Sequence, residues 1–231
     1  MIATGLEIVY STRRRLDRHA RRRAVRPIEY VVEIVGVICD PRVGEPVGRL
    51  FARRVELARA VTEGRCALPD VFDAEQTLFD CYRGLYDVET CLPREAPPGV
   101  PAAHNDLLVI DLVEIDPARR GRGLGLAALL ETIEVWGGGC DFACVDSSPI
   151  PSGEAPPEGP AVVRLDDDGP WVVRKLQSYW ARLGFVPLAG TSCSALDLRP
   201  VRTGLPGPTA ARLARESGPR GAVVPFVLRK E

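Results

Sequence analysis

The hydrophobic pattern in the first half of the chain predicts two strands followed by a helix. Residues 27–40 are rich in β-branched residues, as strands are. Residues 47–60 alternate well enough to form a partner strand across the intervening turn. A helix is predicted over Val71–Cys91 with Asp70 as its N-cap, because aromatic residues recur there at helical spacing. We expect these aromatic residues to pack in the core rather than to line a ligand site; they are Phe72, Phe79, Tyr82 and Tyr86.

In the second half, strand and helix patterns alternate, which predicts an α/β chain. The order is strand 107–115, helix 123–136, strand 141–146, a helix from Pro170 to Gly184, and strands 185–188 and 195–199. The triple glycine 137–139 is expected to end the first of these helices with a left-handed C-cap. Residues 147–169 form a proline-rich loop with the acidic run Asp166–Asp168, and loops of this length are usually functional lids or disordered.

The composition is that of a globular protein, and its positive charge is unevenly placed. Of 231 residues, 45% are hydrophobic and 26% charged, which allows one sizeable core. No stretch approaches the roughly 20 apolar residues of a bilayer span, and no leader of a basic then an apolar segment opens the chain, so we expect a soluble, cytoplasmic protein. The first 26 residues carry eight arginines against Glu7 and Asp17. We interpret them as a solvated basic helix after a strand at Leu6–Tyr10, because a nucleic-acid binder would show further basic clusters and exposed aromatic residues.

The predicted organisation is a basic arm (residues 1–26), one domain (residues 27–199) and a tail (residues 200–231). The seven cysteines include no C-x-x-C pair, and with only His19 and His104 no zinc-ligand spacing occurs. We therefore predict no metal site and expect the cysteines to be reduced core residues.

The clearest chemical signal is the turn between Ile115 and Leu130. A strand ends, three alternating glycines follow, and a helix begins. Glycine permits a tight turn and the close approach of a ligand, and the free N–H groups and dipole of a helix start attract anions. The turn is therefore predicted to bind a pyrophosphate group, with added positive charge from Arg119, Arg120 and Arg122.

One ligand class that fits this turn is a nicotinamide dinucleotide. Residues 123–128 match the fingerprint G-x-G-x-x-A, and Asp146 lies near its acidic position. Two features argue against it. The first glycine of the fingerprint normally follows the strand at once, whereas residues 116–122 intervene here, and a doubly wound sheet needs more βα units than the chain supplies.

Two motifs resemble the GNAT superfamily of N-acetyltransferases. Residues 120–125 (R-G-R-G-L-G) fit the R/Q-x-x-G-x-G/A acyl-CoA motif of that family, after a strand and Asp-Pro. Residues 179–185 (Y-W-A-R-L-G-F) resemble its Y-x-x-x-G-F stretch, where a helix runs into a strand. The resemblance covers about residues 107–199. It implies a mixed, mostly antiparallel central sheet flanked by helices, with the second to fourth strands in a meander.

The resemblance also implies acetyl-CoA as cosubstrate. The backbone of residues 120–125 would hold the pyrophosphate. The strand end would pair with the pantetheine arm and polarise the thioester carbonyl through a main-chain N–H. The expected binding residues are Val113, Ile115, Arg120, Gly121, Arg122, Gly123, Leu124 and Gly125.

An ammonium group must lose a proton before it attacks the thioester. Asp111 stands where many family members carry a glutamate and is the expected base. Glu114 and Asp146 are alternatives, although a salt bridge or turn role is the simpler interpretation of both, and His104 is a weaker candidate.

The acid that protonates the leaving thiolate is harder to assign. The tyrosine of the family falls on Trp180, whose indole N–H is not a useful acid. Tyr179 is adjacent but about 100° around the helix, so either Tyr179 is recruited or solvent supplies the proton.

The predicted function is transfer of an acetyl group from acetyl-CoA to an amine of a small molecule or a protein by direct attack. An acyl-CoA-binding module that no longer catalyses is the alternative that Trp180 favours, and a nicotinamide-dependent oxidoreductase is the third. Neither a membrane nor nucleic acid is expected as a partner. The sequence identifies neither the acceptor nor the oligomeric state, for which a homodimer is one option.

Overall fold

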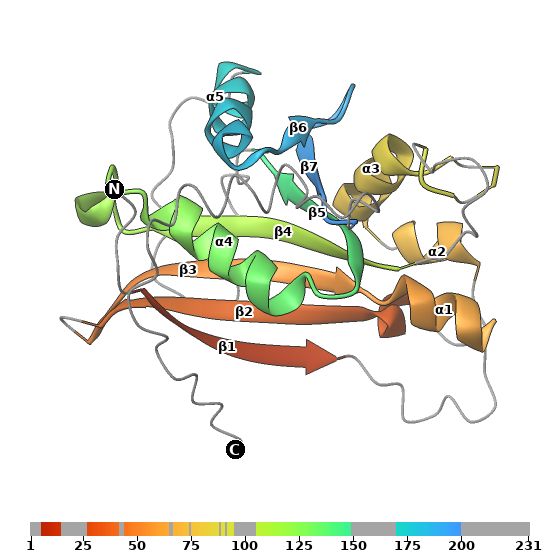
Figure 1. Ribbon diagram of the computed structural model, residues 1–231, viewed down its shortest axis with the longest axis horizontal. Helices are drawn as coiled ribbons and strands as arrows, with labels where there is room; N and C mark the ends of the chain where they lie inside the picture. The colour runs from red at the N-terminus through yellow and green to blue at the C-terminus, as the bar shows by residue number, and fades with distance from the viewer. Residues whose placement is uncertain are drawn as a thin grey trace, which may run out of the picture.

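Alternating apolar residues build seven strands, which join into one sheet (Figure 1). The computed structural model describes residues 6–14, 27–41, 44–64, 67–73, 75–87, 89–90, 92–94, 105–148 and 170–199. The strands are β1 (Glu7–Arg14), β2 (Val31–Asp40), β3 (Glu45–Val55), β4 (Asp106–Ile115), β5 (Cys140–Asp146), β6 (Val186–Pro187) and β7 (Cys193–Asp197). Their order across the sheet is β1-β2-β3-β4-β5-β7-β6.

Neighbouring strands are antiparallel except β4 and β5, which pair in parallel. Strands β1 to β4 form a meander, and helix α4 (Leu124–Trp136) makes the crossover that the parallel pair requires. The prediction of a mixed, mostly antiparallel sheet flanked by helices is confirmed. A doubly wound dinucleotide-binding sheet has a parallel core, and the described strands contain a single parallel pair.

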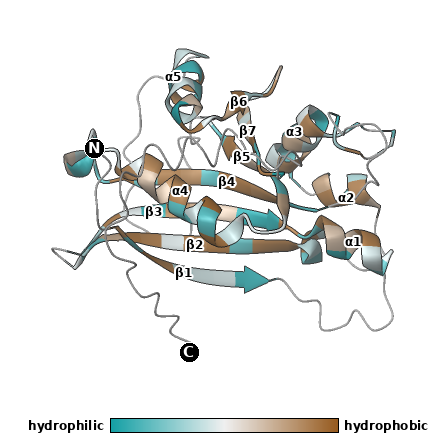
Figure 2. Cartoon of the chain, viewed as in Figure 1, coloured by the Kyte–Doolittle hydropathy of each residue, from teal (hydrophilic) through white to brown (hydrophobic). Residues whose placement is uncertain are grey.

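Different helices cover the two faces of the sheet (Figure 1). Helices α4 and α5 (Pro170–Trp180), with the 3-10 turn η3 (Ala181–Leu183), pack on one face, which we call the α4 face. The other face, the α3 face, is covered by η1 (Pro27–Tyr30), α1 (Leu57–Glu63), α2 (Leu68–Phe72) and α3 (Gln76–Leu85). Figure 2 shows the apolar residues concentrated in the central strands between these two layers.

Helices α1 to α3 begin and end at other residues than the sequence predicts. The helix expected over residues 71–91 is wrong in extent, because α2 ends at Phe72 and the extended backbone of Glu75 (φ −153°) separates it from α3. Asp70 lies in the first turn of α2 rather than at its N-cap. The strand predicted over residues 47–60 stops at Val55, since α1 begins two residues later.

The aromatic residues of α2 and α3 pack in the core, as predicted. The rings of Phe72 and Tyr82 stack with centroids 4.5 Å apart, and those of Tyr82 and Tyr86 with centroids 5.6 Å apart. All three side chains are buried. Phe79 is half-buried, with the guanidinium of Arg83 5.7 Å from the centre of its ring.

Helix α4 ends at the triple glycine, but not through a left-handed cap at its first position. Gly137 has right-handed backbone, and only Gly139 is left-handed, with φ +79°. A Cβ atom on Gly137 would lie 2.5 Å from the Ile133 carbonyl oxygen and 3.1 Å from Leu198. Gly137 is therefore required by close packing.

The strand expected at Leu6–Tyr10 is present and continues to Arg14, so the prediction of a helix is wrong for Arg13 and Arg14, which pair with β2. All eight residues of β1 pair with β2. Tyr10 also joins β1 to α4 through a 3.0 Å hydrogen bond with Thr132 and an edge contact with Trp136. The rest of the arm, both histidines, residues 149–169 with the acidic run, and the tail from residue 200 lie outside the described residues. Within the described ranges, no helix has the length and apolar character of a membrane span.

Candidate functional site

Strand β4 is paired on both sides in its first half and on one side in its second half. Strand β5 pairs with β4 only from Asp106 to Ile110, whereas β3 pairs with it as far as Ile115. Among the described residues, none pairs with the β5 side of β4 beyond Ile110. Backbone N–H and C=O groups of residues 111–115 on that side, except the Ile115 carbonyl, have no strand or side-chain partner among the described residues and can bind an extended molecule.

A β-bulge lies where the two halves of β4 meet. Ala52 pairs with Ile110 and Phe51 with Leu112, so Asp111 has no partner on β3. Bulges bend a strand, re-aim a side chain and are frequent beside active sites. Here the side chain of Asp111 lies on the α3 face of the sheet, where it meets Arg53 and α3.

The turn after β4 is shaped by two glycines in left-handed backbone. Asp116 accepts a hydrogen bond from the Ala118 amide (2.9 Å) and begins the 3-10 turn η2 (Pro117–Arg119). Gly121 and Gly123 then adopt φ +77° and +78°. A Cβ atom on either would meet no atom of the described residues within 4 Å. These glycines are therefore required by the backbone conformation, which other L-residues adopt at a cost, and the space above them is open.

The first amides of α4 point into this open turn. Gly123 is the N-cap and has no side chain to accept a hydrogen bond, and the first backbone bond runs from the Ala127 amide to its carbonyl (3.1 Å). The amides of Leu124 and Gly125 have no acceptor among the described residues. Free amides and the positive end of the helix dipole together make a site for an anion.

The three arginines of the turn differ in what they contact. Arg120 turns back and donates from Nε to the Ile115 carbonyl (2.9 Å), which fixes the turn on the strand end and occupies one backbone group expected to bind pantetheine. Arg119 lies 3.8 Å from the Asp40 carboxylate. Arg122 is exposed and has no ion pair with any described residue. Its charge is the one most available to an anion.

Tyr179 faces the turn, and Trp180 does not. The Tyr179 hydroxyl lies near the Leu126 amide and 3.2 Å from where a Cβ atom on Gly125 would stand. Trp180 is buried in the core of the α4 face, and its indole nitrogen has no partner among the described residues. Counting along the helix from Gly184 selects Trp180, whereas the structure places the phenol of Tyr179 at the turn. Burial raises the pKa of Tyr179 above the usual tyrosine value, so the hydroxyl carries its proton at neutral pH.

Asp111 is held by a buried arginine from the neighbouring strand. The Arg53 Nε donates to Asp111 Oδ2 at 2.8 Å, and its Nη2 contacts Oδ1, so both carboxylate oxygens are engaged. The remaining nitrogen, Nη1, contacts Glu75 at the start of α3. The side chain of Arg53 is 5% exposed and that of Asp111 17%, against 48% for Glu75. One buried positive charge thus serves two carboxylates.

The protonation of Asp111 is set by opposing influences. Burial raises the pKa of the Asp111 carboxyl above its usual value, and the Arg53 guanidinium opposes this rise without cancelling it. The carboxylates of Glu75 and Asp146 raise the same pKa further, because like charges disfavour ionisation. The net effect is a carboxyl that holds a proton more tightly than an exposed aspartate does.

Three buried cysteines, Cys81, Cys144 and Cys193, meet on the α3 side of Asp111. The contact with the Cys144 thiol, followed by burial, raises the pKa of Cys81 well above the usual thiol value, and contact with Cys81 does the same for Cys193. All three are buried and none forms a disulfide, which confirms the expectation of core cysteines for these positions. No group of three or more His, Cys, Asp or Glu side chains in the described ranges is arranged to hold a metal ion.

The alternative bases have contacts that match their simpler interpretation. Glu114 accepts a 2.6 Å hydrogen bond from Arg49, its partner across the β3–β4 pair. Asp146 ends β5 and accepts hydrogen bonds from the Ser148 amide (2.8 Å) and the Ser192 hydroxyl (2.7 Å). Glu114 therefore stands in a cross-strand ion pair and Asp146 in a turn, while His104 lies outside the described residues.

The predicted residues fall into two groups on opposite faces of the sheet. Val113, Leu124 and Tyr179 pack against the core of the α4 face, next to the glycine turn, while Asp111 lies on the α3 face. Sequence reasoning missed Arg53 and Glu75. The sequence could have indicated Arg53, because an arginine within a buried strand requires an acidic partner. Nothing in the sequence indicated Glu75, which is exposed.

No protein-family model matches the sequence, and no curated protein matches it. Several solved structures are partly similar to it, including the following two. One is the crystal structure of a bacterial toxin, with a TM-score of 0.39 and 12% identity over 83% of this chain and 75% of that chain. The other is a mosquito arylalkylamine N-acetyltransferase (like 5b), with a TM-score of 0.30 and 17% identity over 53% of this chain and 54% of that chain. Because both TM-scores are below 0.5, neither likeness carries information about the activity of this chain.

Proposed function

We propose that the chain is a GNAT-like N-acetyltransferase that transfers the acetyl group of acetyl-CoA to an amine. One observation carries the proposal: the one-sided half of β4 leads directly into a turn whose amides and left-handed glycines leave open space for an anion. An extended arm ending in a pyrophosphate is the ligand that would use both features at once. Coenzyme A has that form.

Each part of acetyl-CoA would meet a different set of groups. The amides of Leu124 and Gly125, with the charge of Arg122, would bind the pyrophosphate. The backbone groups of residues 111–115 that have no partner, which excludes the Ile115 carbonyl, would pair with the pantetheine arm. An N–H group of this strand segment would also stabilise the negative charge that develops on the thioester oxygen.

The acceptor would approach from the α3 face, where Asp111 lies. Asp111 takes a proton from the ammonium group, directly or through water, and the free amine attacks the thioester carbon. A C–N bond forms, the C–S bond breaks, and the nitrogen loses its second proton. The departing thiolate takes a proton from the Tyr179 hydroxyl or from solvent. The products are an amide, free coenzyme A and one released proton.

The second candidate function is an acyl-CoA-binding module without catalysis. The observation that favours it is the engagement of both Asp111 oxygens by Arg53, which is also the arrangement of a structural ion pair. A carboxylate offers about four lone-pair positions, so two would remain for an amine or water.

Titration calorimetry with acetyl-CoA on the full chain tests the site. Gly123→Ala and Gly190→Ala are a matched pair, because Gly190 is also left-handed (φ +75°) and no atom of the described part of the chain lies within 4 Å of its Cβ position. Each alanine strains the backbone by about 1–2 kcal/mol. We expect Gly123→Ala to weaken acetyl-CoA binding about 10-fold or more and Gly190→Ala to leave it unchanged. Equal affinity in all three proteins would refute the site, and binding of NADH but not of coenzyme A would favour the oxidoreductase.

A turnover assay then separates the acetyltransferase from the acyl-CoA-binding module. Release of free thiol is followed with a panel of small amines and of peptides with free amino groups. Amine-dependent release supports the transferase. Tight binding of acetyl-CoA without release under any acceptor supports the binding module.

A further inference from the structure

We propose that Arg53 is the positioning residue of this site, which fixes the Asp111 carboxylate in the orientation from which it takes a proton from the acceptor amine. The proposal rests on the proposed acetyltransferase function and adds a residue from the neighbouring strand, which the acyl-CoA motifs do not include.

Asp111 needs such a residue because the sheet does not fix it. As the extra residue of the bulge, it has no partner on β3. Arg53 supplies the missing connection from that same strand, with two nitrogens on the two carboxylate oxygens. A planar guanidinium fork matches a carboxylate in this two-point geometry and defines its plane, which a single ammonium does not do.

Arg53 is itself held in place. Its side chain is 5% exposed, and its strand is paired on both sides by β2 and β4. The third nitrogen contacts Glu75, so the guanidinium also joins the start of α3 to the bulge. Asp111 is therefore oriented by a group with little freedom of its own.

Arg53 also supplies the positive charge next to Asp111. Among the described residues, the other titratable groups around this carboxylate are Glu75 and Cys81 from the α3 side and Asp146 at the end of β5, of which two are acidic and the thiol is neutral. Loss of the guanidinium would leave only groups that disfavour ionisation. The base would then be protonated at a pH where it is ionised in the native protein.

The test is the pH dependence of kcat/KM in the native protein, Arg53→Lys and Arg53→Met. We expect the acidic limb of the profile to move to higher pH in Arg53→Met. Arg53→Lys keeps the charge but loses the fork, so its kcat/KM should fall about 10-fold with a smaller movement of the limb. Arg54→Met is the control, because Arg54 pairs with Asp106 in the other half of β4 and the variant should keep the native profile.

A folded Arg53→Met with the native acidic limb would overturn the proposal. If Arg53→Met does not fold, Arg53→Lys decides: native kcat/KM and a native limb would overturn it. A carbon-13 NMR titration of the Asp111 carboxyl gives a readout that does not depend on turnover, and we expect its pKa to rise in both Arg53 variants. If this pKa rises but the native protein transfers no acetyl group, the proposed function is refuted, while Arg53 remains the residue that holds the Asp111 carboxylate. If the pKa does not rise in the variants, the role of Arg53 itself is refuted.

Discussion

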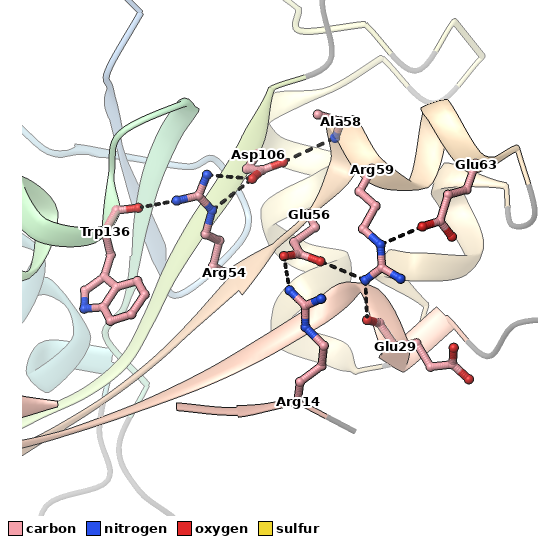
Figure 3. A network of polar contacts seen from close by, with 9 residues as sticks. All are labelled: Arg14, Glu29, Arg54, Glu56, Ala58, Arg59, Glu63, Asp106 and Trp136. Atoms are coloured by element: carbon pink, nitrogen blue, oxygen red, sulfur yellow. Dashed lines mark hydrogen bonds and ion pairs between the residues drawn. The ribbon is translucent and has the colours of Figure 1, made fainter. Parts of the chain in front are cut away.

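Two neighbouring arginines of β3 each bind an aspartate of β4, yet the two pairs differ in their further partners and in the face of the sheet on which they lie. Arg54 donates to Asp106 at 2.9 and 2.8 Å, and its Nη1 donates to the Trp136 carbonyl at 3.2 Å. Asp106 also accepts from the Ala58 amide at the start of α1, at 3.3 Å (Figure 3). This pair joins β3, β4, α1 and α4 through backbone groups.

The Arg53–Asp111 pair has no such backbone partners among the described residues. Its further contact is with the side chain of Glu75, which is half-exposed. The pair lies at the bulge, on the other face of the sheet, where the strand loses its β5 neighbour. Backbone groups complete the Arg54–Asp106 pair, which therefore serves structure. The Arg53–Asp111 pair has no such partners among the described residues, and under the proposed function it is the pair expected to take part in chemistry.

A second group of ion pairs lies beside the Arg54–Asp106 pair (Figure 3). Next to the Asp106 network, Glu56 binds both Arg14 of β1 and Arg59 of α1, and Arg59 also pairs with Glu63 at 2.7 Å. These pairs are partly exposed, so each contributes little alone. Together they connect the edge strand to the helix that follows β3.

The largest expected effect is on the stability of the doubly paired half of β4. Leu108 is fully buried in the α4-face core, so Leu108→Ala should lower the free energy of unfolding by about 3 kcal/mol. Leu112 is half-buried in the one-sided half, and Leu112→Ala should cost about 1 kcal/mol or less. Denaturant unfolding of both variants measures the difference. Equal losses would show that the two halves are packed alike.

The second effect separates the two aspartates. Asp111→Asn should reduce kcat about 100-fold, because an amide cannot take the proton, and should change acetyl-CoA affinity little. Asp106→Asn should reduce the midpoint of unfolding and leave kcat near the native value. The comparison fails if both variants lose turnover to the same degree, or if Asp111→Asn retains native turnover.

The third effect is on the pH dependence of activity and of stability. Because the base must be ionised, activity should fall as the pH is lowered through the raised pKa of Asp111, at a higher pH than an exposed aspartate would give. The stability effect has the opposite sign. A raised pKa of Asp111 in the folded state stabilises the folded protein at a pH below the pKa of the unfolded chain, about 3.9. This contribution is lost as the pH rises through the pKa of the folded state. Unfolding of the native protein and of Asp111→Asn across this range measures it; parallel curves would contradict the shift.

The smallest effect is at the contact between α5 and the glycine turn. A methyl group on Gly125 would stand 3.2 Å from the Tyr179 hydroxyl, so the phenol must shift by a few tenths of an ångström. We expect Gly125→Ala to weaken acetyl-CoA binding a few-fold, with a stability change of about 1 kcal/mol or less. Tyr179→Phe removes the clashing oxygen, so the two substitutions should be non-additive in calorimetry. Strict additivity would show that the hydroxyl does not lie against Gly125.

Much of the second half of the chain was predictable, because its signals are local. The strand before Asp116, the glycine turn and helix α4 each depend on residues close together in sequence. Left-handed backbone at Gly121 and Gly123 follows from the short stretch that contains them. The helix predicted over residues 71–91 was wrong in extent, since Glu75 has extended backbone (φ −153°) between α2 and α3, and its side chain contacts Arg53, 22 positions away.

The sequence alone therefore determined the order of elements from residue 106 to residue 199, the amide turn and the residue types around it. Only the tertiary structure decided which half of β4 is one-sided, that Asp111 is the bulged residue, that Tyr179 rather than Trp180 reaches the turn, and that Arg53 holds Asp111. The physical reason is distance along the chain. Periodicity and backbone conformation are set by near neighbours, whereas strand register and ion pairs join residues such as Arg53 and Asp111, 58 positions apart, which only the folded sheet brings together.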